Sequence, residues 1–310
     1  MQIYRHINDF PKNTRPVLTL GTFDGVHMGH QKILAHLRNI AETTDGKVTL
    51  LTFYPHPRKV LFPEMTDMQL LSTLDEKCNL LEKYGVQQLI IQPFSRDFSM
   101  LDHDDFIKNI LVDKLGVKTL VIGYDHQFGH NRKGSFKDLQ ELAPSMGFNV
   151  VEIPKQDIEA TAVSSTRIRK ALFRGEVELA AHLLGYDYAI SGQVVKGNQI
   201  GRTIGFPTAN INVEDPEKLI PANGVYAVMV NVNGQLHRGA MNIGTRPTFD
   251  NGERKLEVFL LNFDKDIYGE RITVHFKFRL RDELKFPSVD KLIEQMNVDI
   301  RTTLELLPVI

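Results

Sequence analysis

The sequence predicts an α/β domain built around a parallel sheet, followed by a small antiparallel β-barrel or sandwich with a terminal helix. The chain has 310 residues, about twice the length of a typical domain. Its first part alternates short β-branched runs with amphipathic segments, which is typical of a parallel sheet covered by helices. Its last part contains strand-like runs in direct succession, separated by glycine, asparagine and aspartate turns. The character of the sequence changes near residue 186, so domains 1–185 and 186–310 are predicted.

The first domain is predicted to alternate strands with helices. Buried strands are expected at 16–20, 47–53, 86–91, 117–123 and 148–153. Helices are expected at 29–43, 74–84, 104–115, 135–146 and 165–184. Ligands of a parallel sheet bind beyond the carboxyl ends of its strands, so residues that directly follow a strand are the first candidates for a site.

The second domain is predicted to be mainly antiparallel. Asn233-Gly234 separates two apolar runs, which is a strong signal for a β-hairpin. A helix at 288–305 would close the domain. Strands are expected at 188–197, 224–234, 235–244, 254–263 and 271–281.

Composition excludes several functional classes. The net charge is −1 and no basic stripe with interleaved aromatic residues occurs, so no nucleic-acid partner is expected. The N-terminus lacks the apolar core of a signal peptide and no later run could span a bilayer, so no membrane partner is expected. The single cysteine, Cys78, excludes an internal disulfide and is expected to be a buried helix residue. These features favour a cytoplasmic protein.

The segment GTFDGVHMGH, residues 21–30, follows the first expected strand and leads into the first expected helix. His27 and His30 would lie on one face of the first helical turn, where free backbone N–H groups and the helix dipole favour an anion. Gly25 and Gly29 would let a ligand approach the backbone closely. The pattern indicates a phosphate site without the lysine of a P-loop.

Two other interpretations of the histidine pair stay open at this point. A His-x-x-His spacing often arises by chance. A metal site is conceivable because His126 and His130 form another close pair, but zinc needs a third converging ligand and the chain has no cysteine cluster and no HExxH motif.

A second segment, VSSTRIR at 163–169, follows the last strand of the first domain. Its serine and threonine can cap a helix, and Arg169 would lie in the first turns. Hydroxyls, free N–H groups and a guanidinium together suit a polyphosphate, although a capped surface helix with solvated arginines has the same pattern. Two such helix starts after strands of one sheet favour a phosphate ligand.

The paired HxGH and SSTxIR segments resemble the nucleotidyltransferase superfamily, which transfers an adenylyl group from ATP. With GYDHQFGHNRKG at 123–134 and TFYPHP at 52–57, the first domain looks like the N-terminal module of bifunctional riboflavin kinase/FAD synthetases. The resemblance implies a Rossmann-like α/β nucleotidyltransferase fold and the conversion of FMN and ATP to FAD and pyrophosphate. It implies that ATP contacts Phe23, Asp24, His27, His30, Asn131, Ser165, Thr166 and Arg169, and that flavin contacts Asp125 and His126.

One position departs from that family pattern. The family usually has Asp-Phe where this chain has Asp125-His126, which puts the flavin side of the pocket in question. The chemistry itself needs no protein base, because the FMN phosphate is already ionised at neutral pH. Catalysis then rests on positioning and on charge neutralisation by imidazoles, N–H groups and Mg²⁺.

The second domain carries a glycine-rich segment, GNQIGRTIGFPTAN at 197–210. Its spaced glycines, Gly197, Gly201 and Gly205, would allow N–H groups to surround a phosphate, although such a segment is more often a turn-rich connection. Thr208 and Asn210 would point the same way in an extended chain and offer oxygen ligands for Mg²⁺ held with a nucleotide.

Glu257 interrupts the apolar run LEVFLL at 256–261. A partly desolvated carboxylate in a strand could serve as a general base, whereas a solvated edge-strand glutamate is the plain alternative.

GxxxGxxxGFPTAN, NIGTRPTF at 242–249, LEVFLLNF and RDELKF at 281–286 look like the riboflavin kinase module, in that order. The resemblance implies a small β-barrel with a C-terminal helix, Mg-ATP at Thr208 and Asn210, and Glu257 as the base for the riboflavin 5′-hydroxyl. It implies that the flavin is flanked by Asn242, Thr248, Arg281 and Glu283.

The sequence therefore predicts a two-step flavin enzyme that uses ATP as co-substrate with Mg²⁺, and that binds riboflavin, FMN and FAD. A kinase whose first module has lost adenylylation is the alternative enzyme, motivated by His126. A flavin-binding sensor without turnover is the alternative of another class, and Glu257 argues against it because a sensor has no use for a base.

Overall fold

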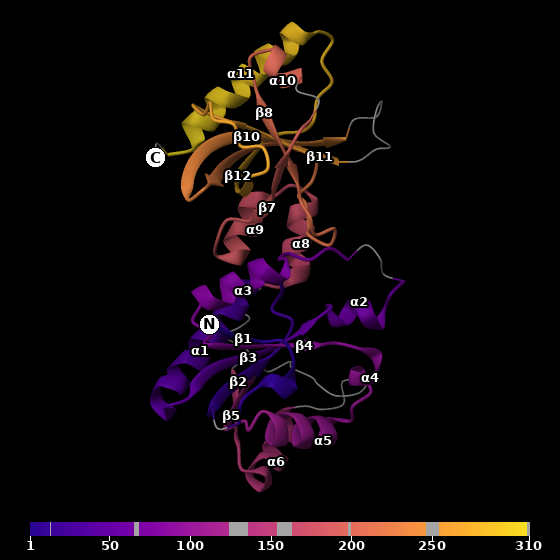
Figure 1. Ribbon diagram of the computed structural model, residues 1–310, viewed down its shortest axis with the longest axis vertical. Helices are drawn as coiled ribbons and strands as arrows, with labels where there is room; N and C mark the ends of the chain where they lie inside the picture. The colour runs from indigo at the N-terminus through magenta and orange to yellow at the C-terminus, as the bar shows by residue number, and fades with distance from the viewer. Residues whose placement is uncertain are drawn as a thin grey trace. The chain divides into compact units, whose positions relative to one another are not determined.

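The chain folds into two compact units, Met1–Ser164 and Ser165–Ile310, each described here by itself (Figure 1). The computed structural model describes residues 1–12, 14–64, 68–123, 136–153, 163–197, 200–245 and 254–308. Within these residues no helix combines the length and the apolar character that crossing a membrane requires.

The first unit is a parallel sheet in the strand order β1-β4-β3-β2-β5-β6, which confirms the predicted α/β class (Figure 1). Strand β1 was not expected from the sequence, because three residues at the chain start give no alternation to read; it pairs with β4. The strands are β1 (Gln2–Tyr4), β2 (Pro16–Leu20), β3 (Lys47–Tyr54), β4 (Gln88–Pro93), β5 (Thr119–Gly123) and β6 (Asn149–Ile153).

Helices cover both faces of this sheet and bury two separate apolar clusters. On one face α1 and α3 pack on the strands, with Leu34, Leu37 and Leu81 in the cluster. On the other face η3 and α6 contribute Ile107 and Leu139. The helical segments are η1 (Ile7–Asp9), η2 (Asp24–Val26), α1 (Met28–Thr44), α2 (Pro57–Leu61), α3 (Leu74–Lys83), α4 (Arg96–Ser99), α5 (His103–Asp105), the π-helical η3 (Phe106–Lys114) and α6 (Phe136–Met146).

The helix expected at 165–184 is two helices, α8 (Ser165–Phe173) and α9 (Val177–Leu184). They are separated at Gly175, whose φ of 75° cannot continue a helix. Both belong to the second unit: Ala222 N donates to the Leu172 carbonyl, and Arg279 N donates to Glu178 Oε1 at 3.2 Å. The structural division therefore precedes residue 185, while the division of activities at 185/186 stays a prediction.

The rest of the second unit is a closed six-stranded barrel in the order β10-β11-β8-β7-β12-β9, which confirms the predicted barrel. Asn233 and Gly234 form the predicted hairpin turn with φ of 50° and 85°. The elements are β7 (Ala189–Val195), α10 (Ile200–Thr203), β8 (Thr208–Asn212), β9 (Gly224–Val232), β10 (Gln235–Thr245), β11 (Arg254–Leu260), β12 (Arg271–Arg281) and the closing helix α11 (Val289–Leu306).

Candidate active sites

The two histidines of the first unit stack on each other where β2 gives way to α1. His27 is the residue that precedes the first turn of α1, and His30 lies in that turn. Their ring centroids are 3.7 Å apart with an interplanar angle of 16°. Phe23 stacks on His30, with centroids 4.5 Å apart. The sequence placed both imidazoles on one face of the helix start, and the structure shows them there.

The loop that leads to this ring stack has a special backbone. Phe23 has a φ of 48° and Gly25 a φ of 76°, both left-handed. A Cβ on Gly29 would come within 3.3 Å of the His27 ring. Gly29 was expected to leave room for a ligand; the room it leaves is filled by the His27 side chain.

Burial keeps the ring of His30 uncharged. It lowers the pKa of His30 well below 6.5, and electrostatic interactions with His27 and Lys77 lower that pKa further. The Nδ1 atom of His30 is buried and has no hydrogen-bond partner among the described residues. A neutral imidazole with an unused ring nitrogen can still offer a hydrogen bond to a ligand that reaches it.

Asp24 anchors the loop from the inside. Its carboxylate accepts hydrogen bonds from the backbone N–H of Leu71 at 3.0 Å and from that of Ser72 at 3.2 Å. The Ser72 hydroxyl in turn accepts from Gly25 N at 3.1 Å. The side chain is only 4% exposed. Asp24 therefore holds the loop in place. Its contact with ATP, which the sequence resemblance implies, stays a prediction.

Lys77 was missed by the sequence reasoning. It lies in α3 and its side chain is buried, with its pKa lowered mainly by that burial. The signal was present in the sequence: position 77 falls on the same helical face as Leu74, Cys78 and Leu81. A lysine on an apolar face is unusual enough to single out.

The remaining residues expected for the first site either belong to the second unit or lie outside the described residues. Ser165, Thr166 and Arg169 begin α8 in the second unit, where Thr166 is exposed and Arg169 is partly buried. Their part in the site stays a prediction. Asp125, His126 and Asn131 lie outside the described residues, as does Thr248 of the second domain.

In the barrel, three neighbouring strands bring four of the expected residues into register. Asn210 of β8 pairs with Glu257 of β11, which pairs on its other side with Asn242 of β10. Thr208 lies two residues before Asn210 on β8, and its hydroxyl donates to Glu257 Oε2 at 3.5 Å. Strand β8 was not expected, because its sequence TANIN follows a proline and resembles a turn.

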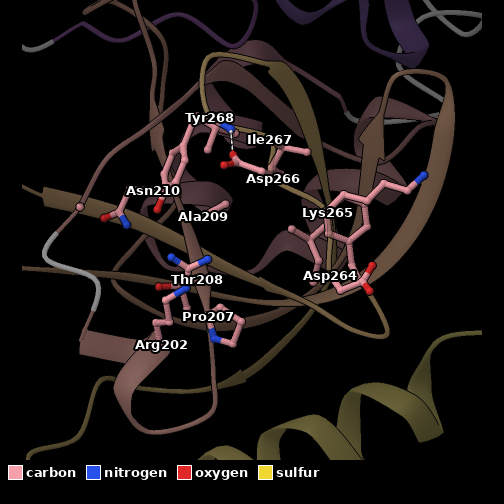
Figure 2. Close-up of a pocket in the computed structure, with 14 residues that line it drawn as sticks. Arg202, Pro207, Thr208, Ala209, Asn210, Asp264, Lys265, Asp266, Ile267 and Tyr268 are labelled. Atoms are coloured by element: carbon pink, nitrogen blue, oxygen red, sulfur yellow. Dashed lines mark hydrogen bonds between the residues drawn. The ribbon is translucent and has the colours of Figure 1, made fainter.

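Two cavities open on either side of Thr208. The first, of about 330 Å³, lies between β8 and the segment 264–268. Figure 2 shows Thr208, Ala209 and Asn210 of β8 and, from that segment, Asp266, which accepts a hydrogen bond from Tyr268 N at 3.0 Å. No sequence signal had pointed to this segment. Also lining the first cavity are Val194, Gly197, Arg202, Pro207, Leu260, Phe263, Asp264, Lys265 and Ile267.

The second cavity, of about 240 Å³, lies between the barrel and α11. Glu257 and Asn242 line it from the strands, and Leu292 and Met296 line it from the helix. Thr208 lines both cavities. The other lining residues are Gly201, Ile204, Val225, Ala240, Phe259, Arg281, Glu283, Leu284, Phe286, Asp299 and Ile300.

Arg281 and Glu283 are held at the edge of the second cavity. Arg281 makes a bidentate ion pair with Asp299 of α11, with Nε–Oδ1 at 2.9 Å and Nη2–Oδ2 at 2.8 Å. Asp299 is 6% exposed and was missed by sequence reasoning. Glu283 Oε2 accepts from Asn223 at 3.5 Å. The pair fixes the Arg281 guanidinium beside the cavity.

Two of the three glycines of the 197–205 segment serve the packing of this site, and the third, Gly205, has a left-handed backbone. A Cβ on Gly197 would lie 2.3 Å from Nδ2 of Asn210, and one on Gly201 would lie 2.2 Å from the carbonyl oxygen of Phe206. Gly205 has a φ of 85°. Gly197 therefore lets the chain approach Asn210 of β8, and Gly201 lets it approach Phe206; the contact of the glycines with a phosphate stays a prediction.

Comparisons with known proteins match each part of the chain to a family. The FAD synthetase family matches residues 9–167 and the riboflavin kinase family matches residues 184–307. The bifunctional riboflavin kinase/FMN adenylyltransferase of Haemophilus influenzae is 41% identical over 286 residues, 92% of each chain. That of Listeria monocytogenes is 40% identical over 288 residues, 93% of this chain and 91% of the relative.

A solved structure resembles the whole chain. The crystal structure of a macrolide-efflux protein from Streptococcus pneumoniae aligns with a TM-score of 0.89 and 34% identity, and covers 97% of each chain. Both matched families are enzyme families, which does not favour the monofunctional kinase or the sensor. By its sequence over nearly its whole length, the chain belongs to the bifunctional riboflavin kinase/FMN adenylyltransferase family.

Proposed function

We propose that the two barrel cavities form the riboflavin kinase site, with ATP in the first and riboflavin in the second. The observation that carries this assignment is the place of Thr208, which lines both cavities and donates to Glu257. A phosphoryl group passes directly between two substrates, so their reacting ends must meet. Thr208 and Glu257 mark the point where a nucleotide in one cavity and a flavin in the other would meet.

Glu257 is the base of this step. Its carboxylate takes the proton from the riboflavin 5′-hydroxyl, and the oxygen attacks the γ-phosphorus of ATP. The bond from the γ-phosphorus to the β–γ bridging oxygen breaks, so that FMN and ADP are formed. Asn242, Arg281 and Glu283 line the flavin side, and Arg281 is held there by Asp299.

The residues beside the first cavity fit Mg²⁺. The Thr208 hydroxyl and the Asn210 amide oxygen are hard oxygen donors, and Glu257 adds a carboxylate to their surroundings. Mg²⁺ in kinases takes few protein ligands because the nucleotide phosphates supply the others. When bound, the ion would neutralise charge on the phosphates. Gly197 lies close to Asn210 of β8, and phosphates would lie beside it and beside Gly201 and Gly205.

The histidine pair of the first unit is the proposed site of adenylyl transfer. His27 and His30 bind the ATP phosphates at the start of α1, supported by Phe23 and Asp24. The FMN phosphate attacks the α-phosphorus of ATP, and pyrophosphate leaves with the electron pair of the broken bond. In the family assignment Asn131 holds ATP, Asp125 and His126 face the flavin, and Ser165, Thr166 and Arg169 steady the pyrophosphate.

Flavin chromatography tests the two sites in one preparation. The full chain, incubated with riboflavin and Mg-ATP alone, is expected to form FMN first and then FAD. His30→Ala is expected to abolish FAD formation from FMN and to leave FMN formation from riboflavin near its original rate. Equal loss of both activities in this variant would contradict the division of labour.

A further inference from the structure

Lys77 is a nearly buried ammonium directly behind the GTFDG loop. Its side chain belongs to the first turns of α3, and the residue is 8% exposed. Nζ donates to the Thr22 carbonyl at 3.3 Å and to the Thr52 hydroxyl at 3.4 Å. The Thr52 hydroxyl donates to the same carbonyl at 3.3 Å. Lys77 and Thr52 thus converge on the residue that precedes Phe23.

The charge of this ammonium is poorly compensated. Both of its hydrogen-bond partners are neutral oxygens, and in the described part of the chain no carboxylate forms an ion pair with Lys77. Asp24 acts on it through space and raises its pKa, but burial outweighs that effect and the pKa is lowered. A buried charge that forms no direct ion pair is costly, and a neutral donor would hold the Thr22 carbonyl equally well. A lysine at this position is therefore energetically unfavourable if its contact with the Thr22 carbonyl is purely structural.

The ammonium also acts on the histidine pair. It is one of the charges that disfavour protonation of His30. Phe23, next to the Thr22 carbonyl that Lys77 holds, stacks on the His30 ring. Lys77 thus places a positive charge against the loop whose Phe23 packs on the stacked imidazoles, and positive charge there favours an anion.

We propose that Lys77 is a positioning residue of the adenylyltransferase site, which holds the Thr22 loop and supplies positive charge that is compensated when the ATP polyphosphate binds at His27 and His30. This rests on the proposed function of that histidine pair. The sequence lacks a P-loop, and Lys77 gives its phosphate site a cation from a different helix. Because the lysine acts from behind the loop, its effect falls on ATP binding rather than on the reacting atoms.

Three substitutions separate charge from packing. Lys77→Met keeps the stem and removes charge and donors, whereas Lys77→Gln removes the charge and keeps an amide donor on a side chain that is one bond shorter. Lys77→Arg keeps the charge but places a larger guanidinium in the space of the ammonium, so it is expected to pack less well. Lys83→Met, an exposed lysine of the same helix, is the matched control. For each full-length variant, kcat and KM for ATP in FAD formation from FMN are measured, together with inhibition by inorganic pyrophosphate, thermal unfolding and riboflavin phosphorylation.

Lys77→Met and Lys77→Gln are both expected to raise KM for ATP about 10- to 100-fold, with a smaller change in kcat and weaker inhibition by pyrophosphate. Lys77→Arg is expected to stay closer to the original KM than Lys77→Gln, even if its melting temperature is lower. An unchanged KM for ATP in Lys77→Gln would overturn the proposal. A KM for ATP that rises in step with the loss of melting temperature across all three variants would also overturn it. If the unaltered chain makes FMN but no FAD, the proposed function of the first unit fails instead.

Discussion

Replacing Glu257 by glutamine is the sharpest test of the kinase chemistry. The two side chains have the same shape, and a glutamine oxygen can still accept the 3.5 Å hydrogen bond from Thr208. Glu257 is half-buried and pairs in register with Asn210 and Asn242, so the substitution leaves the strand contacts in place. What is lost is the ability to take a proton.

The Glu257→Gln substitution is expected to lower kcat. Loss of a general base lowers rates by about 10²- to 10⁴-fold, which corresponds to about 3–5.5 kcal/mol of activation free energy. The free energy of unfolding is expected to change by less than about 0.5 kcal/mol, because one long hydrogen bond at a half-exposed site contributes little and is retained. KM for ATP and riboflavin is expected to change less than kcat.

The assay follows FMN formation from riboflavin by chromatography, with FAD formation from FMN in the same preparation as the internal reference. Glu270→Gln, an exposed glutamate before β12, is the matched control. A Glu257→Gln enzyme that keeps its kcat would refute the reasoning, because the base would then have to come from elsewhere. Loss of FAD formation in the same variant would also contradict it.

Two further predictions concern His30 and Gly197. The free energy of unfolding of the first unit is expected to fall as the pH drops below about 6.5, because the unfolded chain binds a proton there while the folded unit, in which the pKa of His30 is lowered, does not. The pH dependence is measured by urea unfolding, and His30→Gln is expected to reduce it; an unchanged pH dependence in that variant would contradict the depressed pKa. Gly197→Ala places a Cβ 2.3 Å from Nδ2 of Asn210 and is expected to raise KM for ATP in the kinase assay about tenfold. Gly234→Ala, where a Cβ meets no atom within 4 Å but the φ of 85° strains the turn, is the control for general destabilisation of the barrel, and equal KM values for both variants would speak against a role of Asn210 in ATP binding.

Much of the first unit could be predicted because its signals are local. Five of its strands are short β-branched runs, and the helices between them have clear apolar faces. The start of α1 at Met28, directly after His27, follows from the strand-turn-helix pattern. The break at Gly175 could not be read in advance, since glycine inside a helical pattern is often tolerated.

The parts of the sites that escaped prediction depend on contacts between distant segments. Asp299 reaches Arg281 across 18 positions of sequence, and the 264–268 segment faces β8 only after the barrel has closed. Neither has a local pattern. Lys77 is different: its position on an apolar helix face was readable, but the meaning of a buried charge depends on what surrounds it, and Thr22 and Thr52 come from other parts of the chain.

The closed barrel has a consequence for how its site tolerates change. An open sheet can absorb a slip of one strand at its free border, but a ring of six strands cannot, because every displacement must be matched all the way around. The closed ring therefore fixes the register that places Asn210, Glu257 and Asn242 side by side. Insertions at the hairpin tip at Asn233 would leave this register unchanged. Deleting one residue of β11 before Glu257 would turn the Glu257 carboxylate to the opposite face of the sheet.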